Sequence, residues 1–119
     1  MKTENLIITE QDYVRLFPIA HSHLLSEELS RAIVVSADRI PTNIVKMNSR
    51  VIYLDESNGL SLEVELVFPD EVDLKCGKIS VLSPVGSALL GHKEGQSIEW
   101  SYINDQYRRL KVVSVVHTT

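Results

Sequence analysis

Residue types that could do chemistry are few in this chain, and they stand far apart. His21 and His23 form a His-x-His pair, which in a strand would place both imidazoles on one face for a transition metal. The pair falls in a predicted loop with no third ligand nearby, so we expect two solvated histidines. Cys76 is the single cysteine, so no internal disulfide can form, and no histidine or Cys-x-x-Cys partner lies near it.

Glycines in the last third of the chain do not form a phosphate site. The spacing of Gly86, Gly91 and Gly95 matches neither the Walker loop nor the dinucleotide fingerprint. We therefore interpret them as glycines at helix ends and turns. Glu27 and Glu28 fall on the polar side of a predicted helix and are expected to be solvated. The sequence therefore predicts no catalytic group, no cofactor and no metal site.

The charge pattern also argues against nucleic acid as the main partner. The net charge is −4, with acids and bases interspersed over 119 residues. Arg108, Arg109 and Lys111 form the densest basic cluster, but neighbouring residues of a strand point to opposite faces. We expect direct DNA contact to be weak or absent.

The chain carries no signal for a membrane or for export. It has no apolar run of about 18 residues and no signal-peptide pattern at its start. Together with the lone cysteine, this predicts a cytoplasmic location.

Two helices are predicted before Pro41, where the periodicity changes. Thr9 can cap the first helix, with Asp12 three residues on, and Pro18 should end it. A second helix is predicted over roughly residues 22–35, where apolar residues follow the spacing of one buried stripe. Because the connecting loop is short, the two helices should form an antiparallel hairpin.

After Pro41 the pattern is that of strands. Asn58-Gly59 is a strong hairpin signal. Ser83 can cap a brief helix that has Pro84 in its first turn and ends at Gly91. The expected fold class is α+β: a helical hairpin over residues 1–40, then an antiparallel-rich sheet with one short helix over residues 41–119. The predicted strands cover residues 44–55, 60–68, 78–82, 96–102 and 106–116.

Two segments resemble a known family. Residues 45–51 read VKMNSRV, and residues 78–96 read KISVLSPVGSALLGHKEGQ. The second is similar to the C-terminal signature of the bacterial Gre-factor superfamily: a strand, Ser-Pro, a helix with Ala-Leu-Leu-Gly, then Gly before a strand. The MNSRV and SPVG strings resemble its Rnk-type branch most. The match covers about residues 41–117.

The resemblance implies an FKBP-like C-terminal domain preceded by an antiparallel coiled coil. In that family the C-terminal domain docks on the rim of the secondary channel of RNA polymerase. In the cleavage factors the coiled coil enters the channel, and two acids at its tip help to hold a metal ion that activates water. By position, Leu82, Ser83 and Pro84 correspond to the polymerase-docking loop. The alternative for these three residues is an ordinary helix cap, and both can hold at once.

The predicted hairpin departs from the cleavage factors in reach and in charge. Arms of roughly 10 to 13 residues extend only about 15–20 Å. The expected tip, residues 18–23, contains no carboxylate, whereas magnesium requires oxygen ligands. We therefore expect a protein that is not an enzyme and does not stimulate transcript cleavage.

Three functions are compatible with the sequence. The first is a non-catalytic RNA polymerase-binding regulator that occupies the secondary-channel rim and competes with Gre cleavage factors. The second is a regulator of another enzyme, such as nucleoside diphosphate kinase, to which the name of the Rnk-type proteins refers. The third, prolyl isomerisation by analogy of fold, is disfavoured because such a pocket needs several aromatics, and Phe68 and Trp100 are expected to be core anchors.

Overall fold

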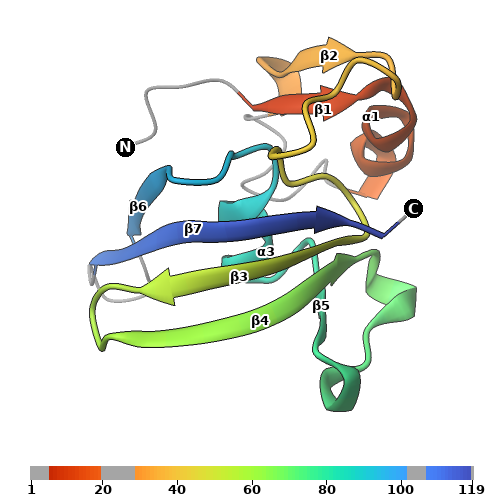
Figure 1. The fold of residues 1–119 in the computed structure, drawn as a ribbon. Coiled ribbons are helices and arrows are strands. Elements are labelled where there is room, and N and C mark those ends of the chain that lie inside the picture. Colours follow the sequence, from red (N-terminus) through yellow and green to blue (C-terminus); the bar gives the residue numbers. More distant parts are fainter. Residues whose placement is uncertain (1–5, 20–28, 102–106, 119) are drawn as a thin grey trace.

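The computed structural model describes residues 6–19, 29–101 and 107–118, which form two sheets and short helices (Figure 1). The main sheet has five strands in the order β5-β4-β3-β7-β6, and the small sheet pairs β1 with β2. The strands of the main sheet are β3 (Ser49–Asp55), β4 (Leu60–Val67), β5 (Lys78–Ser80), β6 (Ser97–Ser101) and β7 (Tyr107–His117). The remaining elements are β1 (Ile7–Thr9), α1 (Glu10–Leu16), η1 (Phe17–Ile19), β2 (Ile33–Val35), η2 (Pro69–Glu71), η3 (Leu74–Cys76) and α3 (Pro84–Leu89).

The five predicted strands and the short helix between the third and fourth of them are present, but the first strand begins at Ser49 rather than at residue 44, and the third ends at Ser80 rather than at residue 82. All pairings in the main sheet are antiparallel except that of β4 with β5, which is parallel. The predicted hairpin at Asn58-Gly59 joins β3 to β4, but only Gly59 has a positive φ, of 75°. Asp55 is paired with Leu60, so residues 56–59 form a four-residue loop rather than a two-residue turn.

A β-bulge in β7 is the main irregularity of the sheet. Ile52 of β3 is opposite Ser114 and Tyr53 is opposite Val112, so Val113 is the extra residue. Glu94 accepts a 2.7 Å hydrogen bond from the backbone N–H of Val115 just beyond it. The bulge is therefore supported by a side chain from the loop before β6.

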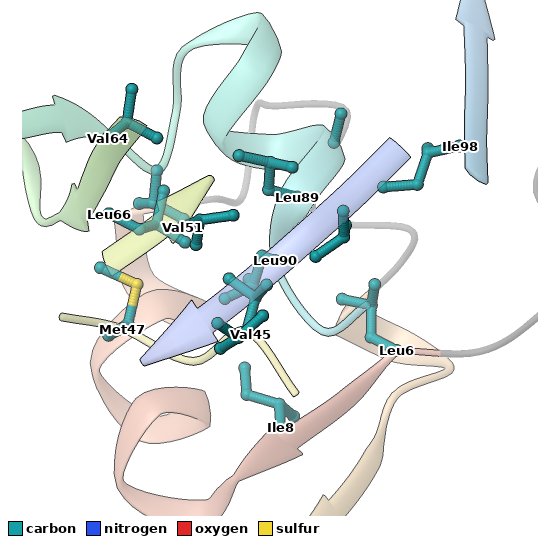
Figure 2. Packing of buried hydrophobic residues seen from close by; sticks show 14 of the residues in the cluster. Leu6, Ile8, Val45, Met47, Val51, Val64, Leu66, Leu89, Leu90 and Ile98 are labelled. Carbon is teal, nitrogen blue, oxygen red and sulfur yellow. The ribbon is translucent and has the colours of Figure 1, made fainter. Parts of the chain in front are cut away.

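The core lies between one face of the main sheet, α3 and the N-terminal elements (Figure 2). Side chains that alternate along β3 and β4 meet those of α3 and the segment before β3, as the period-two pattern requires. Fully buried members of the cluster include Val45, Val51, Leu66, Leu89, Leu90 and Val112.

The N-terminal part departs from the predicted helical hairpin. Thr9 does cap a helix, accepting a 3.1 Å hydrogen bond from the N–H of Asp12, and α1 ends before Pro18. The second predicted helix is wrong at its end, because Ile33–Val35 is strand β2, parallel to β1. These β-branched residues favour an extended backbone, and β1 supplies the edge on which they pair. Leu29 and Ser30 are helical, and residues 22–28 of the prediction lie outside the described residues.

The N-terminal elements pack directly on the body of the protein. Leu6, Ile8, Leu16 and Leu29 belong to the same buried cluster as the core of the main sheet. Gly91 has a φ of 81°, and a Cβ there would lie 2.8 Å from Cβ of Leu6, so this contact requires glycine. The division into residues 1–40 and 41–119 stays a prediction, with buried side chains from both parts in one cluster.

The molecule is compact, with principal dimensions of 36 × 27 × 27 Å. Within the described segments, no helix has both the length and the hydropathy that crossing a bilayer would need.

Candidate functional site

The loop between β5 and α3 is held by the hydroxyl of Ser83. Its Oγ accepts a hydrogen bond from the N–H of Gly86 at 3.0 Å and donates one to the carbonyl of Ser80 at 2.7 Å. Pro84 occupies the first turn of α3, where its missing N–H costs nothing. The sequence predictions of Ser83 as N-cap and Pro84 in the first turn are confirmed.

Ser80 and Gly86 complete this loop, and sequence reasoning gave neither of them that role. The Oγ of Ser80 accepts a 3.0 Å hydrogen bond from the N–H of Leu82. A Cβ on Gly86 would lie 2.2 Å from the carbonyl oxygen of Ser80, so only glycine allows the helix to approach the strand this closely. The tendency of a serine hydroxyl to bond the backbone N–H two residues on was the available signal for the first contact. The second contact arises from tertiary packing alone.

The three predicted docking residues are adjacent but have different surroundings. Pro84 is exposed, Ser83 is half-buried, and Leu82 is half-buried with its side chain packed against the core. The surface offered by the loop is therefore apolar and carries no titratable group. Such a loop can make a protein contact but cannot transfer a proton or hold a metal.

In the basic cluster near the C-terminus, the two described side chains, Arg109 and Lys111, do not form a basic patch. Arg109 is paired with Glu99 at 3.0 Å across β6 and β7, and both side chains are about half exposed. Lys111 is exposed, and the side chain of Arg108 lies outside the described residues. A surface pair of this kind contributes little to stability.

Cys76 ends η3 and is exposed. A hydrogen bond with Asp73 and repulsion from the Asp73 carboxylate raise the pKa of the Cys76 thiol. An activated cysteine requires the opposite shift, since the thiolate is the nucleophile. The arrangement fits the prediction that this cysteine is not a reactive group.

Of the other residues that the sequence analysis singled out, the structure describes only some. Phe68 is buried, as predicted, and the guanidinium carbon of Arg15 lies 3.8 Å above its ring centroid. His21, His23, Glu27 and Glu28 lie outside the described residues, as does the side chain of Trp100. In the parts of the chain that are described, no group of three or more His, Cys, Asp or Glu side chains could hold a metal.

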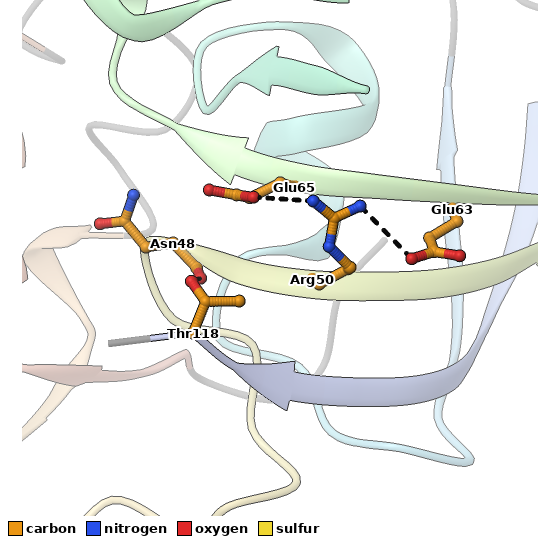
Figure 3. A network of polar contacts seen from close by, with 5 residues as sticks. All are labelled: Asn48, Arg50, Glu63, Glu65 and Thr118. Carbon is orange, nitrogen blue, oxygen red and sulfur yellow. Dashed lines mark hydrogen bonds and ion pairs between the residues drawn. The ribbon is translucent and has the colours of Figure 1, made fainter. Parts of the chain in front are cut away.

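A polar network on the outer face of the sheet was not predicted (Figure 3). Arg50 on β3 binds Glu63 at 3.3 Å and Glu65 at 3.0 Å, both on β4. Asn48 has a φ of 66°, and its carbonyl accepts a hydrogen bond from the hydroxyl of Thr118. The acids that alternate along β4 were the feature of the sequence from which these ion pairs could have been predicted. Together the contacts hold the beginning of β3 against its two neighbouring strands.

An open hollow of about 720 Å³ lies between α1 and the segment before β3. Its lining has mixed charge from Glu10, Asp12, Arg15 and Lys46. Asp12 already accepts a 3.0 Å hydrogen bond from the N–H of Met47, and Arg15 lies over Phe68. Asp12 and Arg15 therefore help to attach α1 to the body.

Comparison with known proteins agrees with this architecture. A family model described as "Transcription elongation factor, GreA/GreB, C-term" matches residues 40–117, which span β3 to β7, α3 and the candidate loop. This chain therefore belongs to the GreA/GreB C-terminal family.

Within that family, the match to an Rnk-type relative covers more of this chain than the match to a GreA relative. The chain is 36% identical over 109 residues to "Regulator of nucleoside diphosphate kinase" of Escherichia coli (strain K12), which covers 92% of this chain and 79% of the relative. It is 40% identical over 74 residues to "Transcription elongation factor GreA" of Thermodesulfovibrio yellowstonii, covering 62% of this chain and 47% of the relative.

Solved structures show the same relationship. A "Prokaryotic transcription elongation factor GreA/GreB from Nitrosomonas europaea" superposes with a TM-score of 0.77 at 36% identity, over 97% of this chain and all of that one. Gfh1 of Thermus aquaticus gives a TM-score of 0.53 at 31% identity, over 77% of this chain and 59% of that one. The resemblance of the sequence to the Gre-factor superfamily is confirmed.

Proposed function

We propose that this chain is a non-catalytic regulator of transcription that binds RNA polymerase. It docks near the secondary channel through Leu82, Ser83 and Pro84, and it competes there with Gre cleavage factors. The supporting observation is the loop between β5 and α3. It holds an exposed proline and a half-exposed leucine on a support fastened by the Ser80–Ser83 hydrogen bond.

The roles of the three residues follow from their contacts. The hydroxyl of Ser83 makes two hydrogen bonds within the loop, so Ser83 positions the loop. Pro84 and the exposed part of Leu82 are then left for the partner. Apolar anchors on a rigid scaffold lose little conformational entropy on binding, which favours a specific contact.

The proposal excludes stimulation of transcript cleavage. α1 has seven residues and spans roughly 10 Å, shorter than the sequence predicted. It is packed on the body, with Leu16 fully buried. Its acids, Glu10 and Asp12, lie in its first turn beside the sheet, and Asp12 is bonded to Met47. Neither acid is placed to reach a distant catalytic metal.

A binding assay with core RNA polymerase tests this proposal. The wild-type chain should be retained by immobilised polymerase and be displaced by a Gre cleavage factor. Pro84→Arg should lose most of the binding. Val113→Arg, which changes an exposed valine on the outer face of β7, is the matched control and should bind like the wild type. Failure of the wild type to bind, or equal loss in both variants, would contradict the proposal.

The same preparation serves for the cleavage test. Backtracked complexes incubated with the wild-type chain should cleave their transcript no faster than complexes alone. Added in excess together with a cleavage factor, the chain should slow cleavage, because both compete for one site. Robust cleavage by this chain alone would overturn the proposal.

A second candidate is regulation of another enzyme, nucleoside diphosphate kinase, through protein contact. Its support is the name of the relatives that match most of this chain. The described residues offer no phosphate loop, so any such effect would be indirect. Co-purification of the chain with the kinase in the absence of polymerase would favour this candidate.

We also expect the body to correspond to the FKBP-like domain of the family without isomerase activity. Tyr53 and Phe68 are buried in the core, and no aromatic residue lines the hollow beside α1. A chromogenic proline-peptide assay should show no activity above the buffer rate.

A further inference from the structure

Ser80, the last residue of β5, is also the first residue of a β-turn that leads towards α3. Its carbonyl accepts a 3.0 Å hydrogen bond from the N–H of Ser83, which closes the turn over residues 80–83. Its Oγ accepts a second bond, also of 3.0 Å, from the N–H of Leu82. The closing bond of a β-turn does not use the N–H of the third residue, and a serine hydroxyl at the first position can accept it.

The residues on both sides of Leu82 are fixed to the body of the protein. Val81 is fully buried, and its N–H donates a 2.9 Å hydrogen bond to the carbonyl of Val67 on β4. The hydroxyl of Ser83 donates to the Ser80 carbonyl at 2.7 Å. Leu82 lies between them, half-buried, with its side chain packed against the edge of the core. The bond to the Ser80 hydroxyl therefore restrains the backbone from which the exposed part of Leu82 projects.

From this turn we infer that Ser80 is a positioning residue for docking, whose hydroxyl holds Leu82 in the orientation that the partner binds. The inference rests on the proposed function, in which Leu82 and Pro84 contact RNA polymerase. A side chain that is already oriented loses less conformational freedom when it binds. Loss of the Ser80 hydroxyl should therefore weaken binding, although Ser80 itself is not part of the proposed contact.

The two roles of Ser80 can be separated by substitution. The carbonyl of Ser80 closes the turn and is approached by α3, since a Cβ on Gly86 would lie 2.2 Å from it. These contacts belong to the backbone, so another residue at position 80 keeps them. Only the bond to the N–H of Leu82 needs an oxygen on the side chain. A change confined to that oxygen thus tests positioning without removing the turn.

Ser80→Thr and Ser80→Val form the matched pair, because the two side chains have nearly the same shape and only threonine has a hydroxyl. Both residue types suit the end of a strand. Ser80→Thr should bind immobilised core polymerase like the wild type, whereas Ser80→Val should bind about 2- to 10-fold more weakly. In the free chains, the amide hydrogen of Leu82 should exchange several-fold faster in Ser80→Val than in Ser80→Thr. Urea unfolding shows that both variants are folded.

A double-mutant cycle with Leu82→Ala distinguishes positioning from a general effect on stability. Leu82→Ala removes the side chain that Ser80 is inferred to orient, while Pro84 keeps part of the contact and leaves binding measurable by titration. In this background, Ser80→Thr and Ser80→Val should bind equally. In the background of Pro84→Ala, which shortens the other contact residue, the difference between them should persist.

The outcomes separate this inference from the proposed function. Equal binding of Ser80→Thr and Ser80→Val by polymerase, with the wild type bound, would overturn the role of Ser80 alone. A difference that persists unchanged with Leu82→Ala would also overturn it, because the hydroxyl would then not act through Leu82. Equal exchange of the Leu82 amide in the two variants would show that the hydroxyl does not hold this residue. Absence of binding by the wild type would instead overturn the proposed function, and the docking role of Ser80 with it.

Discussion

At the scale of single residues, the candidate loop is held in place by the Ser83 hydroxyl, which makes two hydrogen bonds. Ser83 ties α3 to β5 because its Oγ both donates to Ser80 and accepts from Gly86. The serine and proline preferences of a helix start are local, so the sequence alone predicted them. The approach of Gly86 to the Ser80 carbonyl depends on how the helix packs, and no local pattern encodes it.

Ser83→Ala should destabilise the fold by about 1–2 kcal/mol, because it removes the cap and leaves the Ser80 carbonyl with one bond fewer. Urea unfolding measures the change. Ser61→Ala is the matched control, since Ser61 is exposed and no hydrogen bond of its hydroxyl is described, and it should change stability by only a few tenths of a kcal/mol. Equal effects of the two substitutions would contradict the role of the cap.

The thiol of Cys76 provides a test of local electrostatics. Asp73 raises the pKa of this thiol, so at a given pH near 8 a smaller fraction is thiolate than in a free cysteine. Asp73→Asn removes the negative charge, should lower the pKa of the thiol and should therefore speed its alkylation. Rates with a maleimide between pH 7 and 9 measure the shift, and Asp70→Asn is the control. An unchanged rate profile in Asp73→Asn would show that Asp73 does not govern the thiol.

At the scale of elements, the strands were predictable and the N-terminal arm was only partly so. Alternation and the Asn-Gly signal located β3 and β4, because a half-buried strand repeats every two residues. Ile33–Val35 was assigned to a helix because four apolar residues fitted a 3.6-residue period. Its pairing with β1 depends on residues 24 or more positions earlier, which a local window does not contain.

α1 is attached to the body by a few named contacts, and weakening one should loosen the whole element. Asp12→Asn replaces a charge-assisted hydrogen bond to the Met47 N–H by a neutral one. Amide hydrogen exchange over residues 6–16 should become several-fold faster, while that of β3 and β7 should not change. Glu10→Gln, an exposed neighbour in the same turn, is the control. Uniform acceleration across the chain would indicate global destabilisation instead.

At the scale of the whole molecule, the N-terminal residues complete the core of the family domain. Four buried side chains from residues 6–29 contact a cluster built mainly from residues 45–115. The matched family segment begins at residue 40, so part of the core lies outside it. Periodicity predicted two units that meet at Pro41, because it changes there. It carries no information on which units share buried surface, so it could not predict the common core.

Removing residues 1–40 tests how far the body depends on them. The shortened chain should lose roughly 5 kcal/mol of stability or more, since burying each large aliphatic side chain contributes about 1.5–3 kcal/mol. It should also bind a hydrophobic dye through the uncovered Val45, Met47 and Leu90. Chemical unfolding of both chains measures the difference. A truncated chain as stable as the full one would support two independent domains.

The parallel pairing of β1 with β2 has a consequence for how such proteins can diverge. The chain leaves β1 at Thr9 and enters β2 at Ile33, which lies beside Ile7 at the opposite end of the pair. Parallel strands cannot be joined by a tight turn, so this connection must be long enough to run back along both strands. Lengthening it leaves the register of β1 and β2 unchanged, whereas shortening it too far would separate the two strands.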